Sequence, residues 1–317
     1  MTIRHWVMTR IFGIGFLVVM VLLGPSALSV QAQNQQLMGN WLLNMAHPLN
    51  QGIVGWWRGT PSFTGGTTVA DLMPAASHGT WNSMGSFGGT GGWNPTSRRG
   101  GYMMFDFNGS AGYIDVGARG ALDNMPQKTI IAWFNMRSWG GAFLGRMVDK
   151  KGGGGEGAGN GWFFSIDGNG NGRISFFQDF STTKGWWAYD DGATVGQLGI
   201  WRFVAVSYDR TSTSNVPQFY VDGQPVTLNV TNSTPVGTAV DDSGVSLKIG
   251  DDGTGTRVFD GNLEDIIVYN MILSPAIIAQ MYQLSLQGYP GVFAPVIPIP
   301  AQFVPDIGIR RLRIQIE

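Results

Sequence analysis

Three carboxylates lie in loops near the end of the chain's regular pattern, and they are the residues best suited to bind a metal. Asp251 and Asp252 follow the short apolar run 245–250, and Asp260 comes a few residues later. Carboxylate oxygens that adjacent loops bring together can hold a hard cation such as calcium, whose ligands are gathered in space. The sequence therefore suggests calcium as a cofactor at this rim.

A second oxygen-rich segment, residues 167–172, reads DGNGNG. It fits the first half of a calcium loop, with oxygen ligands at alternate positions and glycine at the sixth. The twelfth position is Gln178, which cannot supply the bidentate carboxylate of such a loop. Because Asn-Gly is also the strongest hairpin signal, a plain turn between two strands is the favoured interpretation.

Aromatic rings near polar loops are the candidate ligand-binding residues, because flat rings stack against sugar rings or partner surfaces. Residues 79–101 form a long glycine-rich loop, and loops of this length often carry function. The candidates are Trp81, Trp93, Trp186, Trp187 and Tyr189. The alternative for the tryptophans of the long loop is that they fold back as lids on the core, since a buried Trp contributes a large apolar area.

No catalytic constellation is visible in the sequence. His47 and His78 each lack a second histidine at metal spacing, so a structural role in loops is favoured. Glycoside hydrolysis needs two carboxylates facing one bond, but the neighbours Glu264 and Asp265 should point to opposite faces of a strand. There is no Gly-X-Ser-X-Gly elbow, and the absence of cysteine excludes thiolate sites. We therefore expect no enzyme.

The composition favours short aromatic strands joined by tight turns. The 317 residues include 48 Gly, 18 Phe and 12 Trp, and glycine supplies left-handed turn conformations while aromatics fill pleated surfaces. A net charge of −1 with 13% charged residues gives no field that favours nucleic acid.

Strand patterns position these candidate residues. Residues 201–208 alternate with a period of two, a polar loop follows, and 218–221 return to a turn at Asp222-Gly223. Residues 128–136 are the most continuous apolar run, which predicts a strand buried on both faces. The sequence therefore predicts antiparallel meanders.

These patterns carry a family resemblance. The order Tyr208-Asp209, a polar loop, then residues 219–223 (FYVDG) resembles the hairpin of laminin-G-like (LamG) modules in the concanavalin A-like lectin/glucanase superfamily. Further matching segments at 52–57, 104–116 and 259–270 extend it over roughly residues 52–282. The resemblance implies an all-β fold, an antiparallel two-sheet β-sandwich of the jelly-roll type with one short C-terminal helix.

The resemblance adds one metal candidate. The family's turn before Tyr113 usually carries acidic residues, but Ser110, Ala111 and Gly112 stand there, so the resemblance does not extend the family's calcium ligands to these three positions. Asp115 does match the family pattern and joins Asp251, Asp252 and Asp260 as a candidate ligand. Its place in an alternating strand also fits a solvent-facing residue.

The end of the domain is a helix followed by an extended tail. Ser274 as cap, Pro275 at the first helical position and Gly288 past the end define a short helix. Prolines in 289–317 favour extended chain, so this tail is not a membrane span. The alternation in 310–316 predicts a strand that joins its own sheet or another chain, which would allow self-association.

Residues 1–32 resemble a secretory signal. A basic start precedes the apolar run 11–23, and the small residues Val30 and Ala32 predict cleavage after Ala32. An uncleaved anchor is the alternative, but the run is shorter than the roughly 20 residues that span a bilayer. We expect a secreted or cell-surface protein with a lead-in at 33–51, a domain at 52–288 and a proline-rich tail at 289–317.

Taken together, the sequence favours an exported, non-catalytic binding module that recognises carbohydrate or a protein surface through its rim loops. A structural subunit of an extracellular, cell-envelope or virion-surface assembly is the second hypothesis. A glycoside hydrolase is the third, disfavoured because the two-carboxylate arrangement is missing.

Overall fold

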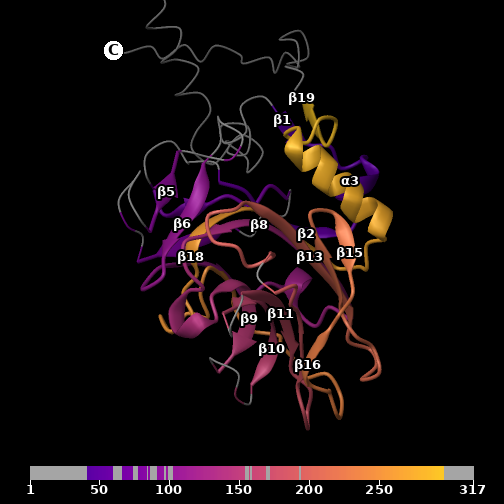
Figure 1. Ribbon diagram of the computed structural model, residues 1–317. Helices are drawn as coiled ribbons and strands as arrows, with labels where there is room; N and C mark the ends of the chain where they lie inside the picture. The colour runs from indigo at the N-terminus through magenta and orange to yellow at the C-terminus, as the bar shows by residue number, and fades with distance from the viewer. Residues whose placement is uncertain are drawn as a thin grey trace, which may run out of the picture.

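The computed structural model describes residues 41–59, 66–73, 78–83, 85, 91–95, 98, 103–153, 157, 159–168, 172–192 and 194–295. Within them, two large antiparallel sheets pack face to face beside one α-helix (Figure 1). The predicted all-β sandwich is confirmed. The predicted signal segment, residues 1–32, lies outside the described residues.

The first sheet has nine strands among the described residues, and its outer face will hold the candidate site. In order across the sheet these are β16 (Val230–Ser233), β12 (Gly185–Tyr189), β11 (Arg173–Gln178), β10 (Asn160–Asp167), β9 (Arg146–Gly152), β17 (Leu247–Ile249), β7 (Tyr113–Gly117), β4 (Gly79–Asn82) and β3 (Thr68–Val69). Every pairing between neighbours in it is antiparallel.

The second sheet has eight strands in the described part of the chain. In order these are β15 (Gln224–Val226), β14 (Gln218–Val221), β13 (Arg202–Asp209), β8 (Gln127–Met136), β18 (Asp260–Tyr269), β6 (Met104–Asn108) and β5 (Trp93–Asn94), with β2 (Ile53–Trp57) paired to β18. Short 3-10 turns are η1 (Pro48–Asn50), η2 (Gly120–Leu122) and η3 (Gly141–Phe143).

The hairpin between β14 and β15 closes as the sequence predicts. Asp222 and Gly223 both have positive φ, 47° and 80°, the geometry of a two-residue turn that suits antiparallel strands. A Cβ on Gly223 would also lie 2.8 Å from the Cβ of Tyr282. Glycine is therefore needed there both for the turn and for the helix that packs on it.

The main core lies between the two sheets. Alternate residues of β10 and β11 point into it, including Trp162, Phe164 and Phe176, and face Ile130 and Phe134 of β8. The intervening residues of β8, such as Ile131 and Trp133, are equally buried against a second core on the other side of the sheet. The prediction that this run is buried on both faces is confirmed.

The second core is covered by the helix α3 (Pro275–Leu286). Ser274 caps it by accepting from the Ile277 backbone N–H at 3.4 Å, and Gly288 follows with φ +80°, so the predicted helix is confirmed. Trp133 Nε1 donates to Ser285 Oγ at 3.0 Å. The helix is thereby fixed to the outer face of the eight-stranded sheet.

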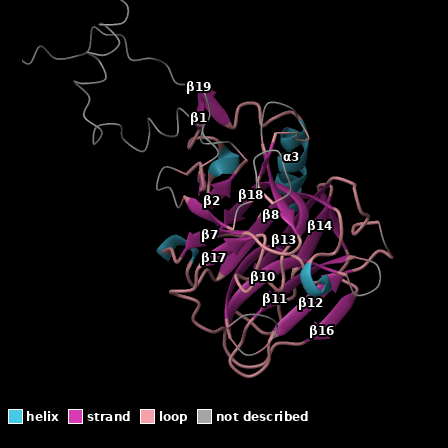
Figure 2. Ribbon diagram, turned by 90° about the vertical axis from the view of Figure 1, so that its left-hand side faces the viewer, coloured by secondary structure: helices cyan, strands magenta, loops and turns pink. Residues whose placement is uncertain are grey.

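A two-stranded sheet lies next to α3. It pairs β1 (Trp41–Leu43) with β19 (Phe293–Pro295), one from the predicted lead-in and one from the predicted tail. Tyr289 and Phe293 pack on Trp56 with ring centroids 4.9 and 5.3 Å away. Figures 1 and 2 place this pair at one end of the molecule and β16 at the other. The predicted strand at 310–316 lies outside the described residues.

Candidate functional site

The outer face of the nine-stranded sheet carries an ordered set of polar and aromatic side chains. Because alternate residues point to opposite faces, those between the core residues of β10 and β11 face outward. The ladder pairs Phe163 with Phe177 and Ser165 with Ser175. Its last pair is Asp167 with Arg173, and β12 adds Trp186 beside Phe177.

Aromatic rings and cations stack along this face. Phe163 and Phe177 are parallel, 4.6 Å apart at 13°, and Trp186 meets Phe177 edge-on at 6.3 Å. The Arg146 guanidinium lies 3.4 Å over Phe163. Lys184 Nζ lies 5.5 Å from the Phe177 ring and 5.8 Å from the Trp186 ring. These cation–π contacts fix the side chains against the sheet.

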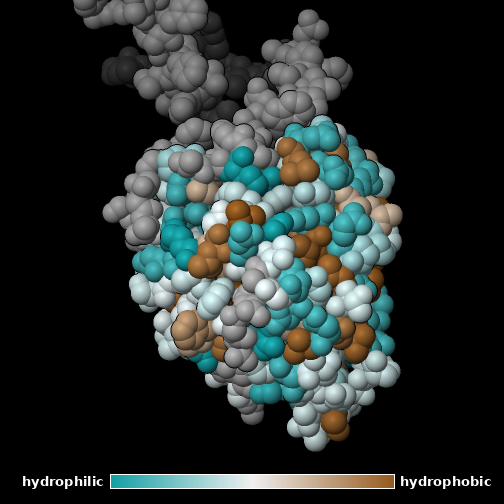
Figure 3. Space-filling model, in the orientation of Figure 1, coloured by the Kyte–Doolittle hydropathy of each residue, from teal (hydrophilic) through white to brown (hydrophobic). Residues whose placement is uncertain are grey.

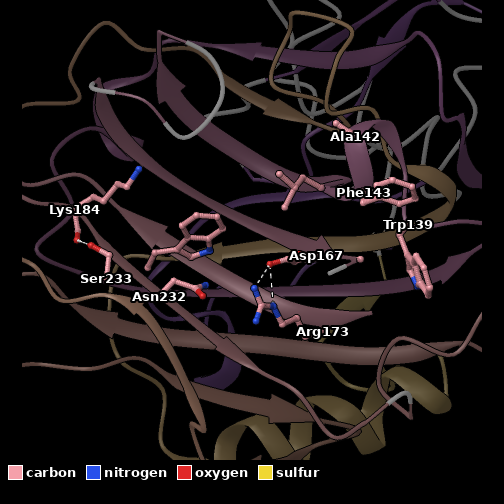
Figure 4. Close-up of a pocket in the computed structure, with 11 residues that line it drawn as sticks. Trp139, Ala142, Phe143, Asp167, Arg173, Lys184, Asn232 and Ser233 are labelled. Atoms are coloured by element: carbon pink, nitrogen blue, oxygen red, sulfur yellow. Dashed lines mark hydrogen bonds and ion pairs between the residues drawn. The ribbon is translucent and has the colours of Figure 1, made fainter. Parts of the chain in front are cut away.

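A groove of about 780 Å³ opens on this face (Figure 4). Its lining is Trp139, Ala142, Phe143, Leu144, Asp167, Gly168, Arg173, Lys184, Trp186, Asn232 and Ser233. Figure 4 shows Trp139 and Phe143 at one end, Lys184, Ser233 and Asn232 at the other, and the Asp167–Arg173 pair between them. The groove thus combines an apolar end with a polar end.

The apolar end includes an exposed aromatic ring on a stretch of backbone with unusual φ angles. Ala142 and Phe143 both lie in the left-handed region, with φ of 49° and 59°, which non-glycine residues rarely adopt. Phe143 is nevertheless 63% exposed. Strained backbone of this kind clusters at functional sites, so the exposure of this ring points to a contact surface.

The remaining surface argues against a large apolar docking face on the side shown in Figure 3. There, hydrophobic residues form small separate patches among hydrophilic ones. Scattered apolar residues are normal for a protein surface. No helix in the described part of the chain is long and apolar enough to cross a bilayer.

Ionisable groups on the outer face are paired with one another. Asp167 accepts from Arg173 Nε at 2.9 Å and from its NH2 at 2.6 Å. Asp149 accepts from Arg146 Nε at 3.1 Å, and burial raises its pKa to about 6 while the Arg146 charge opposes the shift. These carboxylates are therefore held as ion pairs in the sheet.

Among the predicted aromatic residues, only Trp186 lines this groove. Its neighbour Trp187 points to the core and is 1% exposed, because adjacent strand residues face opposite sides. Tyr189 is partly buried and packs at the edge of that core. Trp81 and Trp93 lie in the core with ring centroids 5.4 Å apart. For these two, the alternative of packing on the core is the one observed.

The predicted metal ligands do not come together. Asp251 accepts from the backbone N–H groups of Gly255 and Arg257 at 2.8 and 3.1 Å, and Asp252 accepts from Thr254 N and Oγ1 at 2.9 and 2.6 Å. These two carboxylates therefore close their own loop. Burial raises the pKa of Asp251, and the neighbouring Asp252 charge adds to the shift.

The other two candidates are also engaged locally. Asp260 pairs with Arg137 Nε at 3.0 Å and accepts from Ser138 Oγ at 2.7 Å. Asp115 accepts from Gly117 N at 2.8 Å. Within the described residues, no three His, Cys, Asp or Glu side chains are grouped to hold a metal. The four carboxylates thus form no cluster of three or more in the described part of the chain, and each is engaged by neighbouring donors.

The remaining candidates of the sequence have structural roles. His47 Nδ1 accepts from Leu49 N at 3.3 Å and caps η1, and His78 Nδ1 accepts from Asp71 N at 3.1 Å. Asp167, the first residue of the calcium-like segment, is paired with Arg173, and residues 169–171 lie outside the described residues.

One inference about Glu264 and Asp265 is wrong. The two side chains do not point to opposite faces, because the register of β18 shifts between Glu264 and Ile267 and Asp265 has φ +48°. Both carboxylates approach Arg98, at 3.5 and 4.0 Å, and Asp265 lies 3.3 Å from Arg58. They are buried ion pairs on the other sheet and do not line the groove.

Most groove residues were not singled out from the sequence. The period of two in β10 and β11 does contain a signal, since it places Asp167 and Arg173 at the same end of a hairpin on the outer face. Lys184 lies two residues before Trp186, also at a strand start. No signal in the sequence marks Phe143, whose exposure depends on the fold of η3.

Comparison with known proteins gives the family and the fold. A laminin G family model, described as the concanavalin A-like lectin/glucanases superfamily, matches residues 108–279. Among curated proteins no relative matches the chain.

Solved structures resemble the chain at low sequence identity. The binding domain of Paraclostridial Mosquitocidal Protein 1 has a TM-score of 0.52 at 12% identity, over 74% of this chain and 52% of that one. The botulinum neurotoxin serotype D binding domain gives 0.50 at 12%, over 73% and 51%.

A third structure, described as "Cell entry of botulinum neurotoxin type C is dependent upon interaction with two ganglioside molecules", gives 0.50 at 13%, over 77% and 53%. The chain therefore spans about half the length of each of these relatives. At these identities the likeness shows the jelly-roll fold.

Proposed function

Since the chain belongs to the concanavalin A-like lectin/glucanases superfamily, we propose that it is a non-catalytic module that binds carbohydrate in the groove on its nine-stranded sheet. The observation that carries this proposal is Trp186, a partly exposed indole on the wall of a groove of about 780 Å³. Pockets of this size that combine aromatic walls with a few polar groups suit small ligands.

The chemistry of the groove suits a sugar. Trp139, Phe143 and Trp186 offer aromatic surface for the C–H faces of a sugar ring. Asn232 offers a side-chain amide that both donates and accepts hydrogen bonds to hydroxyl groups, and Ser233 Oγ, which already donates to the Lys184 carbonyl oxygen, offers acceptor lone pairs. A partner protein with a flat surface would not contact aromatic rings and polar side chains that lie inside one hollow. Carbohydrate is therefore favoured over a protein partner.

The ionised groups support binding rather than hydrolysis. Retaining and inverting glycosidases need one carboxylic acid and one carboxylate flanking the same bond. Asp167 is the only described carboxylate in the groove lining, and Arg173 holds it through two hydrogen bonds. A carboxylate held in this way is a weak candidate for the proton transfer that hydrolysis requires.

In their own descriptions, one structural relative is the binding domain of a mosquitocidal protein, and another is a neurotoxin whose cell entry depends on interaction with two ganglioside molecules. These descriptions support the proposal that the ligand of this chain is a glycan. Export through the signal segment at residues 1–32 belongs to the same proposal, because a glycan-binding module acts where glycans are displayed.

The experiment is a glycan array followed by titration calorimetry with purified residues 33–317. The proposal expects selective binding of one glycan class and its loss in Trp186→Ala, with most of the affinity kept in Trp186→Phe, which retains a ring. Release of reducing ends from the bound glycan would contradict the non-catalytic part. Absence of any glycan binding, with capture of a protein ligand instead, would contradict the carbohydrate part.

A further inference from the structure

A second hollow of about 330 Å³ lies beside the groove, and Lys184 lines both of them. Most of its lining comes from segment 179–184, which joins β11 to β12. Isolated bridges from Phe180 to Ala239 and from Thr183 to Val236 hold this segment in place. The second hollow is therefore bordered by bridge-paired residues and shares Lys184 with the groove.

Asp179 in this hollow carries an unsatisfied acceptor. The residue is 4% exposed, and its Oδ2 has no hydrogen-bond partner among the described residues. Lys151 Nζ lies 3.9 Å away, outside hydrogen-bond distance. Leaving a buried charged acceptor without a donor is unfavourable, so a ligand that brings an N–H or O–H group to Asp179 would gain binding energy.

The other residues that line the hollow indicate which kind of ligand group would donate to Asp179. Ser181, Thr182 and Thr183 are exposed at its edge, and their hydroxyls both donate and accept. The unsatisfied Asp179 oxygen needs an N–H or O–H donor, which an ionised carboxylate or phosphate group does not supply, and the described residues hold no three-carboxylate cluster that would take a metal. Neutral hydroxyl groups are the donors that match this lining.

We propose that the second hollow is a further sugar subsite, in which Asp179 accepts hydrogen bonds from hydroxyls of the residue next to the one held at Trp186. The ligand class is then an extended oligosaccharide that passes Lys184, rather than a single terminal sugar. This inference rests on the proposed carbohydrate function of the groove and adds the requirement for chain length.

The protonation state of Asp179 agrees with this role. Burial raises its pKa to about 6, while the charges of Lys151 and Lys184 oppose the shift. At neutral pH the side chain is therefore a carboxylate, and both of its oxygens can accept hydrogen bonds from a ligand.

The test uses linear oligosaccharides of glucose (cello-series), N-acetylglucosamine (chito-series) and galacturonate, each with one, two, four and six units. Calorimetry measures each against wild type, Asp179→Asn and Trp186→Ala. Asp209→Asn is the matched control, since this carboxylate accepts from Thr211 outside both hollows. A thermal melt of each variant checks that it is folded.

For the series that binds, affinity rises at least about tenfold from one to four units, as expected for one added hydrogen bond to a charged group. Asp179→Asn reduces that ratio by about tenfold, whereas Trp186→Ala weakens every member and Asp209→Asn leaves the ratio as in wild type. Affinity that does not depend on chain length, or a ratio unchanged by Asp179→Asn, overturns the second subsite and leaves the groove itself standing. Failure of all three series to bind counts against the proposed function and this inference together.

Discussion

Lys128 gives the most quantitative prediction about the sandwich. It points from β8 into the main core, is fully buried, and donates to Gln178 Oε1 at 3.0 Å. Burial lowers its pKa from 10.5 to about 7, with Arg210 and Lys150 acting in the same direction and Asp242 and Asp209 opposing. Between those two pH values the unfolded chain binds a proton that the folded chain does not, so stability rises with pH across this window.

The size of the effect follows from the shift. Each pH unit between 7 and 10 contributes up to about 1.4 kcal/mol, which makes the lysine's cost at pH 7 about 4 kcal/mol. Lys128→Met keeps a chain of similar length without the charge. The substitution leaves Gln178 Oε1 without its donor, which costs about 1 to 3 kcal/mol. Subtracting this cost from the gain of about 4 kcal/mol makes the variant more stable than wild type at pH 7 by about 1 to 3 kcal/mol.

The assay is urea unfolding of wild type and Lys128→Met at half-unit steps from pH 7 to 9.5. The predicted difference in unfolding free energy shrinks as pH rises, because only wild type gains stability by losing this proton. Lys248→Met, on the outward face of β17, serves as the control for removing a lysine charge. A difference that stays constant with pH would refute the argument that Lys128 is buried with its pKa lowered.

Three further predictions follow from particular contacts. Binding of the cello-, chito- or galacturonate hexamer weakens as the pH falls through about 6, because Asp179, which faces Lys151 and Lys184, becomes protonated there. Calorimetry at pH 5 and 7.5 measures the two affinities, and equal values would contradict the prediction. Ser274→Ala removes the cap of α3 and lowers the free energy of unfolding by about 1 kcal/mol; an unchanged urea midpoint would show that the cap contributes nothing. Because Asp251 and Asp252 already accept from their own loop, calcium or a chelator leaves the melting temperature unchanged, and a rise with calcium would mean that the loop opens to bind it.

The fold was predictable because its signals are local. The alternation in residues 201–208, the Asp222-Gly223 turn and the Ser274-Pro275 helix start each depend on a few neighbouring residues. The structure places all three as the pattern indicates.

The site was less predictable because it depends on which strands become neighbours. Trp186 and Trp187 are adjacent and chemically identical, yet one lines the groove and the other lies in the core. The register of β12 against β11 decides this. Glu264 and Asp265 illustrate the same limit, since a bulge in β18 overrides the alternation that a regular strand would have.

The measurement that tests the central claim most directly is the affinity of the wild-type chain and of Trp186→Ala for the glycan that the array selects. Binding that Trp186→Ala abolishes, in a variant that melts like wild type, is the predicted result. Equal affinity in the two proteins would contradict the claim that the groove on the nine-stranded sheet holds the ligand.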